Sequence, residues 1–100
     1  MARGVSTATA LVLDALARGS QYGFDILDAT GLPSGTVYPI LRRLETDGCV
    51  TSKWESAKVA QQDQRPPRRY YALTPAGNAL LDDARARFPI LAAAVRLRRA

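Results

Sequence analysis

The chain has 100 residues, of which 47% are hydrophobic and 23% charged, and it carries a formal net charge of +5. A chain of this length builds one modest core, and such small domains often gain stability from a partner chain. The sequence contains no His and a single Cys, which excludes a Ser–His or Cys–His dyad, an imidazole ligand, an internal disulfide and a Cys-based zinc site. We therefore expect a protein that is not an enzyme and needs no metal or cofactor.

The N-terminal segment predicts neither a signal peptide nor a membrane anchor. Arg3 precedes an apolar stretch, but Asp14 and Arg18 interrupt that stretch early. Nowhere do about 18 apolar residues follow one another. A lone Cys49 is most simply a small buried side chain and fits a reducing compartment. The sequence thus predicts a cytoplasmic protein with no membrane contact.

Two helices are expected first. Residues 6–18 repeat apolar side chains at helical spacing, with Ser6 as the N-cap and Gly19 as the stop. Residues 22–30 show a shorter version of the pattern, which Gly31 ends with a left-handed conformation.

A third helix should follow Leu32-Pro33, with Ser34 as its N-cap and its end near Gly48. Its predicted core face consists of Val37, Ile40, Leu41 and Leu44. Two short helices joined by a tight turn containing Gly form a helix-turn-helix.

A β-hairpin is expected next. Residues 49–55 and 68–73 are rich in β-branched and aromatic side chains. Trp54 and either Tyr70 or Tyr71 are interpreted as cross-strand core residues. The polar, Pro-containing segment 56–67 is predicted to be a mobile surface loop at the tip of the hairpin.

The last helix should begin at Thr74-Pro75, because Thr caps free N–H groups and Pro has none to leave unsatisfied. Its apolar residues are spaced in the heptad rhythm of a helix that pairs with another helix: Leu81, Ala84, Phe88, Leu91 and Val95. Pro89 should kink or break the helix around residues 85–88. Within one compact domain, we expect a winged helix-turn-helix over residues 1–74 and a dimerisation helix over residues 75–100.

The positive charge is concentrated in the second half of the chain. Residues 1–48 carry 4 Arg and 5 acidic residues, whereas residues 49–74 and 75–100 each carry 5 basic and 2 acidic residues. A basic hairpin beside a helix-turn-helix is the layout of a winged helix that binds DNA. The predicted fold class is mainly α with a small β-hairpin, an α+β winged helix-turn-helix.

Candidate DNA contacts lie on the outer face of the third helix and in the hairpin. Ser34 and Thr36 can donate to phosphates, Tyr38 offers a ring and a hydroxyl, and Arg42 can clamp a phosphate or a guanine edge. Arg43 fits a solvated outer face equally well. The hairpin contributes further candidates, whose alternative is a solubilising loop: Arg65, Arg68 and Arg69.

Two other interpretations stay open. Tyr38 and Trp54 could meet another protein, which would make the chain a protein–protein interaction module whose basic residues only solubilise it. An apolar cavity at a dimer interface could also hold a small apolar or aromatic effector, although the residues that would line it equally suit an ordinary dimer core: Leu11, Ala15, Leu81, Phe88 and Leu91.

Several segments together resemble the PadR family of transcriptional regulators in its short form. They are Tyr22-Gly-Phe-Asp-Ile26, Ser34-Gly-Thr-Val-Tyr-Pro-Ile-Leu-Arg-Arg-Leu-Glu45, Asp47-Gly48, Trp54-Glu55 and Arg69-Tyr-Tyr-Ala-Leu-Thr-Pro-Ala-Gly77. The resemblance spans about residues 8 to 85. It implies a winged helix-turn-helix repressor that forms a homodimer through its terminal helices and binds an inverted repeat in double-stranded promoter DNA. By motif match, the DNA contacts would be Tyr22, Thr36, Tyr38 and Arg42, with Arg68 or Arg69 in the wing.

Overall fold

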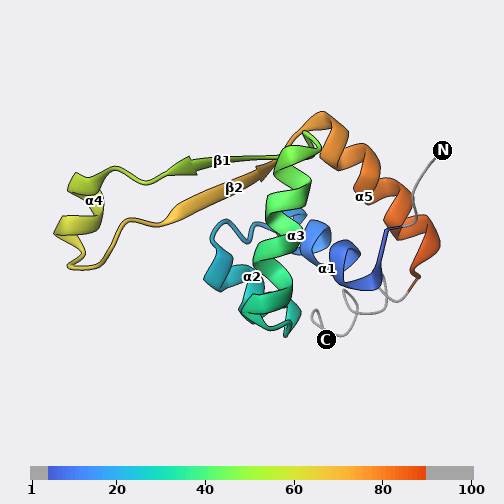
Figure 1. Ribbon diagram of the computed structural model, residues 1–100, viewed down its shortest axis with the longest axis horizontal. Helices are drawn as coiled ribbons and strands as arrows, with labels where there is room; N and C mark the ends of the chain where they lie inside the picture. Colours follow the sequence, from blue (N-terminus) through green and yellow to red (C-terminus); the bar gives the residue numbers. More distant parts are fainter. Residues whose placement is uncertain (1–4, 90–100) are drawn as a thin grey trace.

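The computed structural model describes residues 5–89, which form five helices and one antiparallel hairpin (Figure 1). The elements in chain order are α1 (Thr7–Ala17), α2 (Gly23–Thr30), α3 (Ser34–Thr46), β1 (Val50–Trp54), α4 (Ala57–Gln62), β2 (Arg69–Leu73) and α5 (Pro75–Arg87). The fold is a winged helix-turn-helix, as predicted. None of the helices within residues 5–89 is long and apolar enough to cross a membrane.

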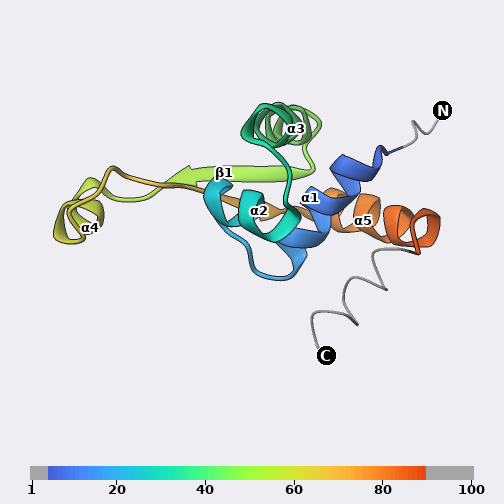
Figure 2. The ribbon, with the colours of Figure 1, turned by 90° about the horizontal axis from the view of Figure 1, so that it is seen from below.

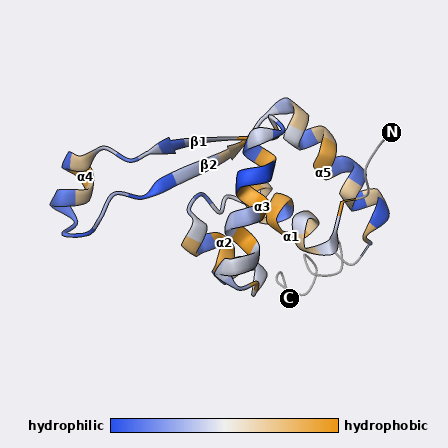
Figure 3. Cartoon of the chain, in the orientation of Figure 1, coloured by the Kyte–Doolittle hydropathy of each residue, from blue (hydrophilic) through white to orange (hydrophobic). Residues whose placement is uncertain are grey.

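The core lies where α1 meets the other helices. Helix α1 packs against α2, α3, α5 and β2, and Figure 3 shows apolar residues on the helix faces that turn toward one another. The predicted core face of α3 is confirmed, since all four of its apolar residues are buried. The largest fully buried side chains are Leu13, Ile26, Leu41, Val12, Val37 and Val50.

The predicted helix ends are largely confirmed. Ser6 caps α1 by accepting a hydrogen bond from the Thr9 amide, and Thr74 caps α5 by accepting one from the Gly77 amide. Gly31 ends α2 with φ of 72°. Ser34 was expected to cap α3, and this was wrong: Pro33 is the N-cap, and Ser34 is the first helical residue. Pro33 presets the extended entry, and its carbonyl accepts from the amides of Thr36 and Val37.

The hairpin extends away from the helices, with α4 at its far end (Figure 1). Its register pairs Val50 with Leu73 and Trp54 with Arg69. The segment before α2 holds the base of the hairpin, because Tyr22 forms a β-bridge with Tyr70 and the Tyr71 amide donates to the Gln21 carbonyl at 2.8 Å. The wing is therefore fixed to the start of the helix-turn-helix.

The expectation of a mobile loop over residues 56–67 was wrong in its first half. Residues 57–62 form the short helix α4, which Ser56 caps by accepting from the Val59 amide. Ala60 is buried against this tip. The polar sequence does not indicate this helix, because it has a cap but lacks a repeated apolar face, which is the signal that predicts helices.

Trp54 is not a core residue, contrary to expectation, since 62% of its surface is exposed. Cys49 is buried as predicted, and burial raises the pKa of its thiol. Helix α5 ends at Arg87, inside the region where Pro89 was expected to break it, because the residue before a proline disfavours helical angles. Leu91 and Val95, two predicted seam residues, lie outside the described residues.

Candidate nucleic-acid interface

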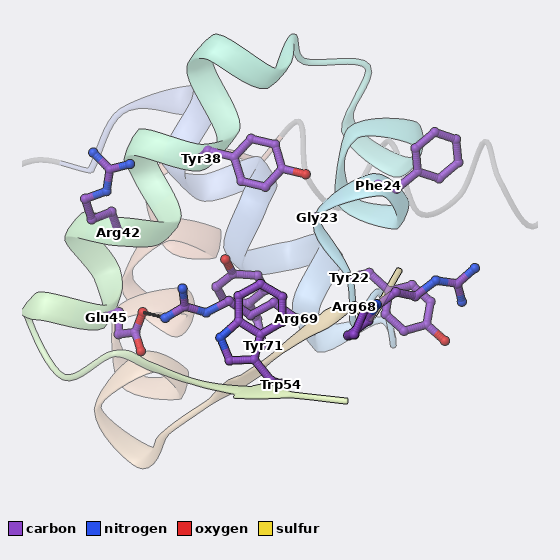
Figure 4. Close-up of a pocket in the computed structure, with 11 residues that line it drawn as sticks. Tyr22, Gly23, Phe24, Tyr38, Arg42, Glu45, Trp54, Arg68, Arg69 and Tyr71 are labelled. Atoms are coloured by element: carbon purple, nitrogen blue, oxygen red, sulfur yellow. Dashed lines mark hydrogen bonds and ion pairs between the residues drawn. The ribbon is translucent and has the colours of Figure 1, made fainter. Parts of the chain in front are cut away.

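A groove of about 510 Å³ lies between α2, α3 and the hairpin (Figure 4). We call it the wing groove. Figure 2 shows α3 to one side of the hairpin, and the groove is lined from this helix by Tyr38, Arg42 and Glu45. Its walls carry five aromatic side chains, three guanidinium groups and one carboxylate, namely Tyr22, Phe24, Tyr38, Trp54, Tyr71, Arg42, Arg68, Arg69 and Glu45.

Helix α3 presents its polar residues on the side opposite the core. Tyr38, Arg42 and Arg43 are exposed between buried neighbours, which follows from the 3.6-residue period. Tyr38 and Arg42 line the wing groove, whereas Arg43 lies outside its wall. Ser34 is exposed at the start of the helix and Thr36 is half-buried, and neither lines the groove.

Tyr38 occupies its position because residue 23 is a glycine. A Cβ built on Gly23 would lie 2.4 Å from the Tyr38 hydroxyl oxygen and 2.5 Å from a ring carbon. The ring therefore lies directly over the first turn of α2, with its hydroxyl pointing across the groove toward that helix (Figure 4). The observed position of the Tyr38 ring therefore depends on the missing side chain at residue 23.

The arginines of β2 and of the segment before it have different surroundings. The Arg68 guanidinium lies 4.5 Å from the centre of the Tyr22 ring, in a cation–π geometry. The Arg69 guanidinium donates to the Ser52 hydroxyl and pairs with the Glu45 carboxylate at 3.2 Å. Among the described residues, no carboxylate pairs with Arg42 or Arg68. These two guanidinium groups are free to meet an anion.

Arg65 is engaged within the wing tip. Its guanidinium pairs with Glu55, with one contact at 2.8 Å, and also contacts Asp63 at 3.2 Å. Glu55 accepts a further hydrogen bond from the Tyr70 hydroxyl at 2.7 Å. The bonds from Arg65 and Tyr70 lower the pKa of Glu55 to about 2, and the bond to Glu55 raises the pKa of Tyr70 to about 12. This cluster joins the two arms of the hairpin just below α4.

The predicted dimer residues divide into two groups. Ala15 and Leu81 are buried in the main core of the chain itself, and Ala84 packs with Ala10 in a small second cluster. Intrachain packing therefore accounts for the burial of these three without a partner. Leu11 and Phe88 are half-buried around the second cluster, at the end of the molecule where α1 meets α5.

Sequence reasoning missed several residues that shape the site. Glu45 and Glu55 were read only as parts of motifs, because their partners lie 24 and 10 residues further along the chain. Gly23 was also noted only as part of a motif, because its contact with the Tyr38 ring arises only when α3 packs beside α2. Trp54 was assigned to the core because aromatic residues of a hairpin often pair across strands, although the acidic residue that follows it at the end of the strand is typical of an exposed position.

These features define a winged helix-turn-helix DNA-binding domain, with a polar face on the second helix of the motif and a basic wing beside it. The chain belongs to the PadR-like family of transcriptional regulators, whose profile matches residues 12–83. It is thus a DNA-binding transcriptional regulator and not an enzyme. Among curated proteins, none matches the sequence.

Solved structures agree with this assignment. A PadR-like transcription factor from Bacteroides fragilis is 28% identical with a TM-score of 0.67, over 88% of this chain and 85% of that one. A PadR family transcription regulator from hypervirulent Clostridium difficile R20291 has a TM-score of 0.71 at 21% identity, covering 95% of this chain and 100% of the other. BpsR of Bordetella bronchiseptica, whose DNA binding is regulated by 6-hydroxynicotinic acid, has a TM-score of 0.65 at 23% identity, over 94% of this chain and 64% of BpsR. The last two similarities concern the fold alone.

Proposed function

We propose that the protein is a dimeric repressor that binds an inverted repeat in promoter DNA, with α3 in the major groove and the hairpin on the neighbouring backbone. The observation that carries the proposal is the wing groove, where Arg42 and Arg68 face solvent without a carboxylate partner among the described residues. A guanidinium without a carboxylate partner breaks no ion pair when it binds a phosphate or a guanine edge. The protein would act in the cytoplasm, the reducing compartment that its single free Cys49 fits.

The individual residues would have different tasks. Tyr38 and Arg42 of α3 would reach into the DNA groove, while Ser34 and Thr36 at the start of the helix would donate to phosphates. Arg43 would contact the backbone from outside the wing groove. On the other wall, Tyr22 and Arg68 would grip the backbone, with Arg69 beside them. Arg65 would act indirectly, by holding the wing tip through Glu55.

DNA binding is tested by fluorescence anisotropy with a labelled duplex that the wild-type protein selects from a random pool, titrated across salt against a scrambled duplex. Arg42→Ala should weaken binding by about ten- to a hundredfold and relax specificity at one position. Arg87→Ala is the control for the loss of one positive charge, because this exposed arginine lies on α5, outside the wing groove. Both variants are compared with wild type only at a concentration at which sedimentation gives the wild-type mass, since Arg87 lies beside the proposed dimer interface. Equal effects of both substitutions would refute the assignment of α3 as the reading helix.

The homodimer would form through residues 75–100 together with α1. Leu11 and Phe88 are the described residues best placed for it, because they are half-buried at the end of the molecule where α5 stops. Two recognition helices would then lie about 34 Å apart, one turn of DNA. Leu91→Asp should convert the dimer into monomers in sedimentation experiments, and an unchanged mass would contradict the predicted seam.

We further propose that a small apolar or aromatic effector regulates the DNA binding of the dimer. BpsR provides the precedent of a similarly folded protein whose DNA binding is regulated by 6-hydroxynicotinic acid. Such a compound would bind at the dimer interface near Leu11 and Phe88. Isothermal titration of the dimer with 6-hydroxynicotinic acid, followed by anisotropy in its presence, tests the idea. Absence of heat together with an unchanged DNA affinity would exclude that compound as an effector.

Exposed aromatic residues favour one alternative, a winged helix that binds another protein. Phe24 and Trp54 are 75% and 62% exposed at the rim of the wing groove. Salt separates the two functions, because binding that neutralises several phosphates weakens steeply with ionic strength, whereas an interface centred on aromatic residues changes little.

A further inference from the structure

Glu45 is the one carboxylate among the described residues that line the wing groove. A negative charge on a surface that meets phosphates opposes binding, so its place there requires a reason. Glu45 lies in the last turn of α3, on the side facing the hairpin, next to Arg69 (Figure 4). Its task therefore concerns the relation between α3 and the wing.

A closed ring of polar contacts joins three elements at this point. The Ser52 hydroxyl on β1 donates to Glu45 on α3, and it accepts from Arg69 Nε and Nη2 on β2 at 3.0 and 2.7 Å. Arg69 Nη2 completes the ring by donating to Glu45 Oε1 at 3.2 Å. The Arg69 guanidinium also lies 5.6 Å from the centre of the Trp54 ring. Arg69 is thus held in one place between the recognition helix and the hairpin.

The ion pair remains open to exchange. The side chains of Arg69 and Glu45 are 40% and 36% exposed, and pairs at such sites are weak and sensitive to salt. A phosphate that approaches Arg69 also approaches Glu45, whose charge repels it. Arg69 consequently adds little to the affinity for random DNA. A duplex that fits α3 makes enough other contacts to bind despite this repulsion.

We propose that Glu45 is a specificity-determining positioning residue, which fixes the wing against α3 through Arg69 and Ser52 and lowers the affinity of the protein for non-specific DNA. The proposal rests on the proposed DNA interface. Negative charge here serves to reject poorly fitting duplexes, a use distinct from the direct contacts made by the arginines.

Glu45→Gln tests the proposal, because the amide keeps the size and an acceptor but removes the charge. We expect the affinity for a scrambled duplex to rise about three- to tenfold, with a salt slope steeper by about one, while the affinity for the selected duplex changes less. The ratio of the two affinities should fall. Asp47→Asn is the matched control, since this exposed carboxylate lies just beyond α3 without contact to Arg69.

A double-mutant cycle with Arg69→Gln shows whether Glu45 acts through Arg69. The effect of Glu45→Gln on the salt slope and on the affinity ratio should vanish in the Arg69→Gln background. If Glu45→Gln unfolds, Ser52→Ala removes the hydroxyl that holds Arg69 beside Glu45 and should lower the affinity ratio in the same direction, but by less, because the Glu45 charge remains. An unchanged ratio in Ser52→Ala would then overturn the proposal.

The proposal about Glu45 would be overturned if Glu45→Gln changed neither the affinity ratio nor the salt slope, or if Asp47→Asn changed them equally. Either result would leave the proposed DNA binding of the wild-type protein intact. A wild-type protein that selects no duplex from the random pool would instead overturn the proposed function, and this inference with it.

Discussion

Replacing Gly77 with Ala should destabilise the protein, although alanine is the better helix former. Gly77 is the third residue of α5, where the helix crosses the start of β1. A Cβ at this position would lie 2.0 Å from the Cys49 carbonyl oxygen and 3.0 Å from its carbonyl carbon. Backbone atoms cannot rotate aside as a side chain can, so α5 must shift outward.

The magnitude follows from opposing effects. Alanine gains up to about 1 kcal/mol of helix propensity over glycine. Overpacking of this kind costs about 1–3 kcal/mol. An outward shift of α5 also strains the hydrogen bonds that hold its start to the strand, from the Thr74 amide to the Cys49 carbonyl at 3.0 Å and from the Thr74 hydroxyl to the Gly48 carbonyl at 2.6 Å, worth about 1 kcal/mol each. The net loss should be about 2 kcal/mol, or roughly 8–16 °C in Tm for a domain of this size.

Gly35→Ala is the matched control, because Gly35 is also helical and a Cβ there would meet nothing within 4 Å. It should raise the free energy of unfolding by about 0.5 kcal/mol. Both variants are measured by urea and thermal unfolding, followed by circular dichroism at one fixed protein concentration because a dimer has a concentration-dependent Tm. A Gly77→Ala variant as stable as Gly35→Ala would refute the reasoning.

Three further outcomes are expected. Gly23→Ala should displace Tyr38 from the wing groove, lowering DNA affinity about tenfold in anisotropy titrations with little change in Tm, because an exposed ring can swing aside; an unchanged affinity would contradict a role for Tyr38. The pKa of Glu55 is lowered from 4.5 to about 2 in the fold, so its stabilisation is complete above about pH 4.5 and is lost as the pH falls toward 2. The difference in free energy of unfolding between wild type and Glu55→Gln should shrink over that range, and a constant difference would be the contrary result. Asp14→Ala should lose about 1–2 kcal/mol in urea unfolding, because buried Asp14 pairs with Arg18 at the end of its own helix at 2.6 Å and with Arg85 of α5 at 3.2 Å; wild-type stability would exclude these two ion pairs as a support of the fold.

The sequence by itself determined the order and type of nearly all elements. Helical spacing of apolar residues, the caps at Ser6 and Thr74, and the left-handed stop at Gly31 act within a few residues of one another. Such local effects can be predicted from the sequence without knowledge of the fold. The same holds for the basic hairpin, since charge by segment requires only counting.

Tertiary structure decided which polar residues are free and which are engaged. Arg65 and Arg68 look alike in the sequence, yet the turn at the wing tip brings the Arg65 guanidinium to Glu55, whereas the Arg68 guanidinium lies over the Tyr22 ring. The role of Glu45 likewise depends on its ion pair with Arg69, which lies 24 residues away in the sequence. These partners meet only when strands and helices from distant parts of the chain pack together, and no local pattern encodes such a distance.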